Sequence, residues 1–173
     1  MTEDHSDIGF FGGYRVAGVL VKDERVLLFT EGLIDFWVLP GGGVKIFESS
    51  EQAIKREFQE EIGVTIAVDR LLWVVENSFI MDEKKYHAIE LTFLVSPLDS
   101  EEKLTQEEFI GYEKDLTLLE GRYKDVKDLK MTFRWFHPNE LDSITIKPDI
   151  YHEALKNIPD HPTLIRNLEV KIE

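Results

Sequence analysis

The sequence predicts a single α+β or mixed α/β domain, and three observations support this fold class. The chain has 173 residues, a length that fits one domain. Hydrophobic residues make up 43% of the chain, which is enough to bury a core. Several strand-like runs alternate with few helical segments, and no internal repeat or linker divides them. We therefore expect one domain over residues 1–173.

The N-terminal part is expected to form a β-hairpin after a loose leader over residues 1–12. Tyr14–Val21 and Arg25–Phe29 are rich in valine and leucine, as strands often are. The polar turn Lys22–Glu24 separates them and favours a hairpin.

A glycine-rich loop and a helix are expected next. The short apolar piece Phe36–Leu39 ends at the run Pro40–Gly43, which is predicted to be a loop because it cannot continue a regular element. Ser50–Ile62 is predicted to be a helix. Its expected end signals are the capping-box pattern of Ser49 with Gln52 and the C′ glycine Gly63.

Two long strands and a polar stretch follow the helix. The strands are Val64–Glu76 and Tyr86–Ser96, around a polar turn at Asp82–Lys85. Residues 97–128 hold ten acidic and five basic residues, and we expect a long acidic insertion there, either a lid or a solvated loop. Leu129–His137 alternates and predicts another strand.

The C-terminal part is expected to contain little regular structure. Pro138–Leu141 predicts a helical turn, and Pro148–Lys156 predicts a short helix with proline at or near its first position. Residues 158–173 contain two prolines and show no clear period, so a tail is expected.

Composition excludes several classes of function. The chain has no cysteine, which excludes disulfides, zinc–thiolate sites and thiol nucleophiles. Its 34 acidic and 20 basic residues give a net charge of −14, which argues against nucleic acid held by a basic face. No signal-peptide pattern or membrane-length apolar run is present, so we expect a cytoplasmic protein with no membrane partner. The acid excess leaves two alternatives, a solvated surface or carboxylates gathered around metal cations.

Three glutamates on the predicted helix bear on this choice. Glu57, Glu60 and Glu61 are spaced i, i+3 and i+4, within roughly a 100° arc of one helical face. They flank an apolar stripe made of Ile54, Phe58 and Ile62. Carboxylates beside a buried stripe have raised pKa values unless cations lie among them, and hard divalent ions such as Mg²⁺ or Mn²⁺ prefer oxygen ligands. A solvated acidic helix face is the alternative.

The spacing around these glutamates favours the cation site. Residues Gly42 to Val64 follow the pattern G-x5-E-x7-R-E-hydrophobic-x-E-E-x-G-hydrophobic without a gap. Its seven fixed positions would match by chance in roughly one such chain in a hundred thousand, given this composition. The segment resembles a complete Nudix box, the signature of the MutT-like Nudix hydrolases. Weaker resemblance is found at Trp37–Gly42, Trp135-Phe136 and Glu140-Leu141.

The resemblance implies a fold and a set of roles. The implied fold is the Nudix α/β/α sandwich with a mixed β-sheet. The implied ligands of Mg²⁺ or Mn²⁺ are Glu57, Glu60 and Glu61, with the carbonyl of Gly42 as a further ligand. Arg56 and Glu48 would form an ion pair that supports these ligands, which suits the fixed fork of donors on arginine. A homodimer is a further expectation from the resemblance.

The implied reaction is the metal-dependent hydrolysis of a pyrophosphate bond in a nucleoside diphosphate linked to another moiety. ADP-ribose, a nucleoside triphosphate and a sugar nucleotide are the small nucleotide-type substrates considered. A general base or water-positioning group is also required. The candidates are a box glutamate, Glu90 on the strand Tyr86–Ser96, or an acid in residues 97–128. Glu90 is flanked by apolar residues, so inward and exposed orientations are both open.

Three other functions are alternatives to this one. A non-catalytic nucleotide-sensing module usually lacks box glutamates, and this box is intact. An RNA 5′-end pyrophosphohydrolase fits poorly with the charge of −14. An isopentenyl diphosphate isomerase needs histidine ligands and a cysteine that the chain lacks. One departure from the family concerns Phe47, which stands where glycine is frequent. It is expected to be a packed loop aromatic, with a stacking wall for a base as the alternative.

Overall fold

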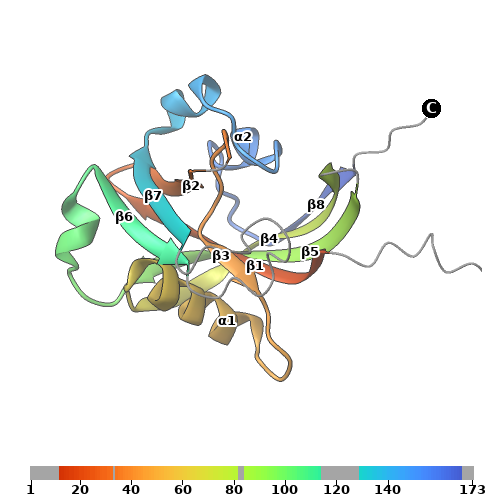
Figure 1. The fold of residues 1–173 in the computed structure, drawn as a ribbon, viewed down its shortest axis with the longest axis horizontal. Helices are drawn as coiled ribbons and strands as arrows, with labels where there is room; N and C mark the ends of the chain where they lie inside the picture. The colour runs from red at the N-terminus through yellow and green to blue at the C-terminus, as the bar shows by residue number, and fades with distance from the viewer. Residues whose placement is uncertain (1–11, 33, 82–83, 114–128, 169–173) are drawn as a thin grey trace, which may run out of the picture.

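The computed structural model describes residues 12–32, 34–81, 84–113 and 129–168. Helices α1 and α2 lie on opposite sides of a mixed β-sheet (Figure 1). The elements in chain order are β1 (Gly12–Lys22), β2 (Arg25–Glu31), β3 (Gly41–Gly43), α1 (Ser50–Glu57), the π-helix η2 (Phe58–Ile62), β4 (Ile66–Met81), β5 (Lys84–Pro97), the 3₁₀-helix η3 (Glu102–Thr105), β6 (Glu108–Glu113), β7 (Leu129–Phe136), the 3₁₀-helix η5 (Pro138–Ser143), α2 (Tyr151–Ala154) and β8 (Thr163–Leu168).

The sheet is built around β1. The strand order is β6-β7-β2-β1-β5-β4-β8, and β3 pairs with β1 beside β2. β1 runs parallel to β5, and β4 runs parallel to β8, whereas the other pairs are antiparallel. The predicted hairpin of β1 and β2 is confirmed by the pairing of Lys22 with Arg25.

Alternation along β1 divides the interior into two cores. Val16 and Leu20 belong to the core that includes Ile54 and Phe58 of the helical segment. Ala17 and Val19 point to the other face, into the core that includes Tyr151 of α2. Side chains of a strand alternate between faces, so one strand supplies both cores. The predicted α/β/α sandwich with a mixed sheet is confirmed.

The main helix begins as the sequence predicts. The Ser49 side chain accepts a bond from the Gln52 N–H group at 3.2 Å, and the Gln52 side chain accepts one from the Ser49 N–H group at 2.9 Å. Gly63 ends the helical segment with φ of +78°, which glycine adopts without strain. On the sheet below, a β-carbon at Gly18 would overlap the Phe58 ring, so glycine lets the helix approach β1 closely.

Three segments expected to be irregular contain strands. The glycine run forms β3 because β1 offers a free edge, where Gly41–Gly43 pair with Arg15–Ala17. The acidic stretch 97–128 contains η3 and β6, and Phe109 of β6 stacks on Phe133 of β7 with ring centroids 5.3 Å apart. The expected tail contains β8, whose mostly exposed side chains leave no hydrophobic period. Tertiary pairing therefore overrides local composition in these segments.

The second predicted helix is shorter than expected. Only Tyr151–Ala154 is helical, and Pro148 precedes it instead of occupying its first position. Tight hydrogen bonds from the Tyr151 N–H to Pro148 and from the His152 N–H to Asp149, each 3.1 Å long, form the turn before the helix.

Several expectations lie outside the described residues or stay predictions. The leader up to residue 11, positions 82–83 of the predicted turn and residues 114–128 of the acidic stretch are not among the described residues. None of the helices in the described ranges has the length and apolar character needed to cross a bilayer. The cytoplasmic location and the homodimer stay predictions.

Candidate functional site

The glycine strand β3 lies directly against the helix that carries the glutamates. A β-carbon at Gly42 would lie 2.5 Å from Oε1 of Glu57, so the Glu57 carboxylate packs directly against the backbone of β3. The Gly41 N–H group donates to Oε2 of Glu61 at 3.2 Å. Gly41 has φ of +149°, and a β-carbon there would overlap the backbone of Val16. The signature segment (residues 42–64) therefore folds back on itself, with carboxylates against glycine backbone.

Arg56 holds three acidic residues of the signature segment together. Its Nε and Nη2 atoms donate to the two carboxylate oxygens of Glu48 at 2.8 and 2.9 Å. Its Nη1 atom donates to Glu57 at 2.8 Å and to Glu60 at 2.9 Å. Nη2 also donates to the carbonyl oxygen of Gly43 at 2.9 Å. One guanidinium thus joins β3, the following loop and the helix, and the expected Arg56–Glu48 pair is in direct contact.

These contacts stabilise the charged forms of the groups. Hydrogen bonds from Arg56 hold the pKa of Glu48 below its ordinary range, although burial opposes the shift. The bond to Glu48 raises the pKa of Arg56 above its ordinary value, and Glu57 and Glu60 act in the same direction. The guanidinium and the Glu48 carboxylate therefore both stay ionised near neutral pH.

The three helical glutamates differ in exposure. Glu57 and Glu61 are buried, with 6% and 3% of their surface exposed, whereas 36% of the Glu60 side chain is exposed. The sequence predicts one helix over Ser50–Ile62, but residues 58–62 form a π-helix, so the prediction is corrected at the end of the helix. The Gly63 N–H group bonds to the Phe58 carbonyl at 3.0 Å, an i to i+5 contact. Such wider turns often occur at functional sites, and this one contains Glu60 and Glu61.

The chemistry of the donor set fits a hard divalent cation. Glu57, Glu60 and Glu61 offer carboxylate oxygens, and the glycine backbone lies within reach of two of them. Within the described ranges, however, no three acidic or histidine side chains already form a ready metal cage. Arg56 instead bridges Glu57 and Glu60. The residues therefore supply suitable ligands with a cationic side chain between them.

Glu90 is not brought together with the other candidates. Glu90 pairs across the sheet with Arg15 of β1 and Val75 of β4, so the three side chains lie on the same face. This face is the one toward α2, because Val75 belongs to the core that includes Tyr151. Oε1 of Glu90 accepts a bond from the Tyr151 hydroxyl at 2.5 Å, and Oε2 lies 3.6 Å from Nε of Arg15. Only 12% of the Glu90 side chain is exposed. Its side chain thus lies on the face of the sheet opposite α1.

Tyr151 and Arg15 are two contacts of Glu90 that the sequence did not single out. Burial raises the pKa of Tyr151, and the neighbouring Glu90 carboxylate adds to the effect, so the phenol keeps its proton. Thr92 provides a second contact, with its hydroxyl 2.6 Å from that of Tyr151. The distance in sequence between β5 and α2 left no local signal for this network.

The expectation that Phe47 packs in its loop is wrong. Its side chain is fully exposed, and Ile46 beside it is 85% exposed. Phe47 also adopts φ of +68°, the left-handed region that favours glycine. The loop between β3 and α1 projects from the body of the molecule (Figure 1), so its tip finds no core to enter.

The Phe47→Gly substitution is expected to stabilise the fold by up to about 1 kcal/mol. Glycine removes the strain of a left-handed L-residue, roughly 1–2 kcal/mol, against a smaller entropic cost in the unfolded chain. Urea unfolding of both proteins measures the difference. Phe47→Ala keeps the strain and serves as the control, and an increase in stability equal to that of the glycine variant would contradict this explanation.

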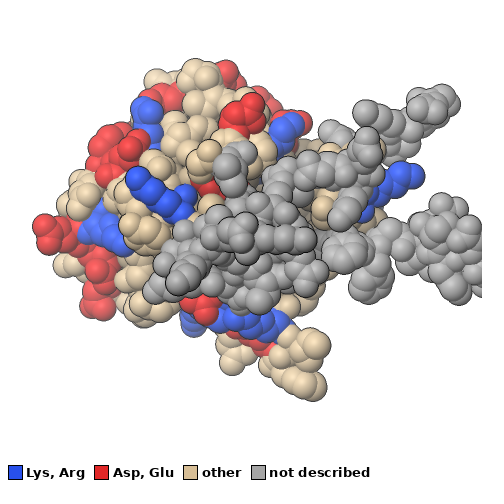
Figure 2. Space-filling view, viewed as in Figure 1, with Lys and Arg blue, Asp and Glu red and all other residues tan. Residues whose placement is uncertain are grey.

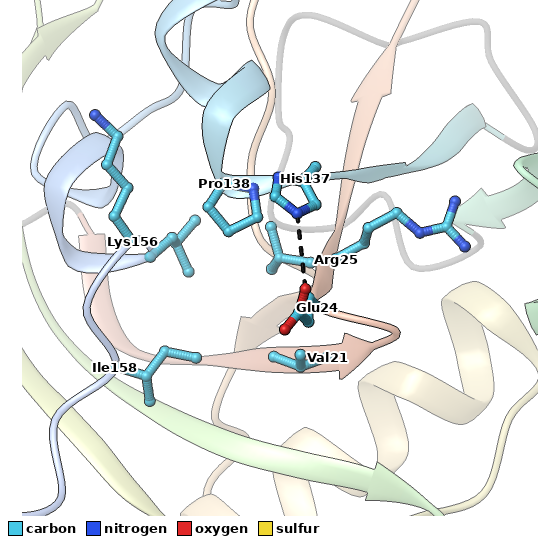
Figure 3. Close-up of a pocket in the computed structure, with 9 residues that line it drawn as sticks. Val21, Glu24, Arg25, His137, Pro138, Lys156 and Ile158 are labelled. Carbon is cyan, nitrogen blue, oxygen red and sulfur yellow. Dashed lines mark ion pairs between the residues drawn. The ribbon is translucent and has the colours of Figure 1, made fainter.

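A cavity of about 440 Å³ lies away from the signature segment (Figure 3). Its walls come from the β1–β2 turn, the start of η5 and the residues after α2, and they are Val21, Glu24, Arg25, Val26, His137, Pro138, Leu155, Lys156 and Ile158. Glu24 and His137 face each other across it, with Oε2 and Nε2 4.0 Å apart. None of the residues that line the cavity is a candidate site residue.

Comparison with known proteins gives matches over most of the chain. A family model described as NUDIX domain matches residues 13–157. The chain is 38% identical over 64 residues to a MutT-like protein of Streptomyces ambofaciens, covering 36% of this chain and 42% of that protein. It is 32% identical over 91 residues to an ADP-ribose pyrophosphatase of Methanocaldococcus jannaschii, covering 51% and 53% respectively. The chain thus spans about half the length of these curated relatives.

A solved structure supports the fold over a longer stretch. The crystal structure of an ADP-ribose pyrophosphatase from Streptococcus suis superposes with a TM-score of 0.57 at 15% sequence identity. The match covers 89% of this chain and 98% of that one. At this identity the likeness concerns the fold alone.

Proposed function

This chain belongs to the NUDIX family, and we propose that it hydrolyses a pyrophosphate bond in a nucleoside diphosphate linked to another moiety, with Mg²⁺ or Mn²⁺ as cofactor. The observation that carries the proposal is the assembly around Arg56. One guanidinium contacts Glu48, Glu57 and Glu60. Carboxylates this close repel one another, so their clustering around one arginine beside the glycine backbone of β3 supports a site that takes a cation.

The residues of the signature segment would have different roles in the proposed reaction. Glu57, Glu60, Glu61 and the Gly42 carbonyl would hold the cation, which when bound neutralises phosphate charge and lowers the pKa of a water. Glu48 would anchor Arg56 through its two-pronged contact and so fix the loop against the helix. Arg56 would offset the negative charge of Glu57 and Glu60, which its Nη1 atom contacts.

The group that positions the attacking water stays a proposal among Glu90, a glutamate of the signature segment and an acid in residues 97–128. Glu90 has a carboxylate oxygen bonded to the Tyr151 hydroxyl and lies on the α2 face. A glutamate of the signature segment lies beside the proposed cation ligands. This position favours a glutamate of the signature segment as the base, because a base must lie within hydrogen-bond reach of the water.

The substrate class is tested by a panel assayed with Mg²⁺ and with Mn²⁺. ADP-ribose is the first candidate, supported by the archaeal relative that carries this activity in its name. A nucleoside triphosphate, a sugar nucleotide and a 5′-triphosphorylated RNA oligonucleotide complete the panel. We expect metal-dependent release of a nucleoside monophosphate from at least one small nucleotide.

Two outcomes of the panel would overturn the proposal. Tight nucleotide binding without turnover of any compound would make the protein a nucleotide sensor. Turnover of the RNA alone would make it an RNA 5′-end pyrophosphohydrolase, against the expectation from a charge of −14. On the face in Figure 2, acidic and basic side chains are interspersed over the described surface.

A further inference from the structure

The acidic stretch after β5 contacts the end of the helix that carries the glutamates. Nζ of Lys103, in η3, donates to the carbonyl oxygen of Ile62 at 2.8 Å. Gly111 of β6 lies against the carbonyl oxygen of Glu61, where a β-carbon would overlap that atom. The segment from η3 to β6 therefore contacts the backbone of two successive residues at the end of the π-helix.

The Ile62 carbonyl is a group that needs a partner. The last carbonyls of a helix lack intrahelical donors and carry the negative end of the helix dipole. The Gly63 N–H group already bonds to the carbonyls of Phe58 and Gln59. A lysine ammonium beside the Ile62 carbonyl, the last one of the π-helix, satisfies it and complements the dipole.

The position of this contact links it to the proposed cation ligands. Ile62 follows Glu61 directly, and its carbonyl, in the Ile62–Gly63 peptide, is one peptide unit beyond the Glu61 carbonyl that Gly111 contacts. Glu61 also bonds to the Gly41 N–H group, so its carboxylate and its carbonyl are held from two sides. A π-helical turn is rarer and less stable than an α-helical one, so its geometry depends on such outside contacts.

We propose that Lys103 is a positioning residue for Glu60 and Glu61. The segment Glu102–Glu113 acts as a clamp that keeps the π-helical turn in register, so that the Glu61 carboxylate faces β3, the Glu60 carboxylate stays beside Arg56, and both take a divalent cation. This inference rests on the proposed function, and it gives part of the acidic stretch a task that its composition does not suggest.

A second lysine separates positioning from simple anchoring. Nζ of Lys22, in β1, donates to the carbonyl oxygen of Leu104 at 3.0 Å. Leu104 is itself buried in the core on the α1 side. η3 is therefore attached to the sheet without Lys103, and the Lys103 bond is directed at the helix end. Lys22 holds the same 3₁₀-helix, and the carbonyl to which it donates lies outside the π-helix.

The experiment compares the unmodified protein with Lys103→Met, Lys103→Arg and Lys22→Met. Direct Mn²⁺ binding, followed by the electron paramagnetic resonance of the free ion, is measured with the metal dependence of hydrolysis and with urea unfolding. Lys103→Met is expected to weaken Mn²⁺ binding about 10–100-fold, the range for groups that orient metal ligands. Lys103→Arg is expected to restore most of the affinity, because it keeps the charge and the donor.

The control and the contrary results are distinct. Lys22→Met is expected to lower stability with unchanged Mn²⁺ affinity. Two results overturn the clamp alone. One is equal weakening of Mn²⁺ binding by Lys22→Met and Lys103→Met. The other is unchanged Mn²⁺ binding in Lys103→Met when the protein hydrolyses its substrate. An unmodified protein that neither binds Mn²⁺ nor hydrolyses the panel overturns the proposed function as well. If Lys103→Met does not fold, Lys103→Gln takes its place in the same comparison.

Discussion

The Glu61→Gln variant is expected to lose hydrolysis by roughly 10³-fold or more while it stays folded. Glutamine has the same shape and keeps an oxygen for the Gly41 N–H group, but it removes one negative charge from the proposed cation ligands. A loss of about 4 kcal/mol of transition-state stabilisation corresponds to this factor in rate. Steady-state hydrolysis of the best panel substrate at saturating Mg²⁺ measures it, and Glu60→Gln is expected to act likewise.

A matched control lies on the same helix. Glu51 is an exposed residue in the first turn of α1 and carries the same charge. Glu51→Gln is expected to leave the rate within about twofold of the unmodified protein, because solvent screens so exposed a charge. Activity of Glu61→Gln within tenfold of the unmodified protein, with an unchanged fold, would remove Glu61 from the proposed ligands.

The Arg56→Met variant is expected to lose about 3–5 kcal/mol of stability, the cost of removing one partner from buried ion pairs. The substitution takes the guanidinium away from Glu48, Glu57 and Glu60. The first two are largely buried, with 15% and 7% of their side chains exposed. Urea unfolding measures the loss, and Arg56→Lys is expected to recover part of it, since lysine keeps the charge without the planar fork.

Arg25→Met is the matched control for loss of an arginine ion pair. Arg25 donates to Glu107 at 2.6 Å, but 63% of the Glu107 side chain is exposed. Such surface pairs contribute about 0–1 kcal/mol. Equal losses from Arg25→Met and Arg56→Met would contradict the central role of Arg56.

The pH dependence of stability gives Arg56 a second signature. The pKa of Glu48 is lowered in the folded protein by its bonds to Arg56. A lowered folded pKa means that the stabilisation is fully present above the unfolded value of about 4.3 and is lost as the pH falls through the folded value. In Arg56→Met this acid-dependent part of the unfolding curve is expected to disappear, whereas Arg25→Met keeps it.

The sequence predicted those features that depend on neighbouring residues. The capping box of Ser49 and Gln52, the end of the helix at Gly63 and the Arg56–Glu48 contact all lie within one short segment. Their spacing fixes their geometry, because each pair is separated by one or two helical turns or a short loop. The α/β/α fold followed from the resemblance carried by the same segment.

The features that escaped prediction depend on partners distant in sequence. β3 consists of glycines and forms only because β1 leaves an edge open. β6 lies in an acidic stretch, and its apolar side chain Phe109 finds Phe133 of β7. The contacts of Lys103 with Ile62 and of Tyr151 with Glu90 join residues with no shared local pattern. The prediction that Phe47 packs in its loop is wrong because it rests on the usual burial of aromatic side chains.

The pairing of β2 with the distant strand β7 has a consequence for synthesis of the chain on the ribosome. Val64 completes the signature segment, but β2 pairs with β7 only after β7 has been synthesised, and β7 ends at Phe136, 72 residues later. At about 5–20 residues per second, this interval lasts roughly 4–15 s. During it the apolar stripe of Ile54, Phe58 and Ile62 lacks part of its final cover. The glutamates beside the stripe would then keep the nascent chain from aggregating, before they meet any substrate.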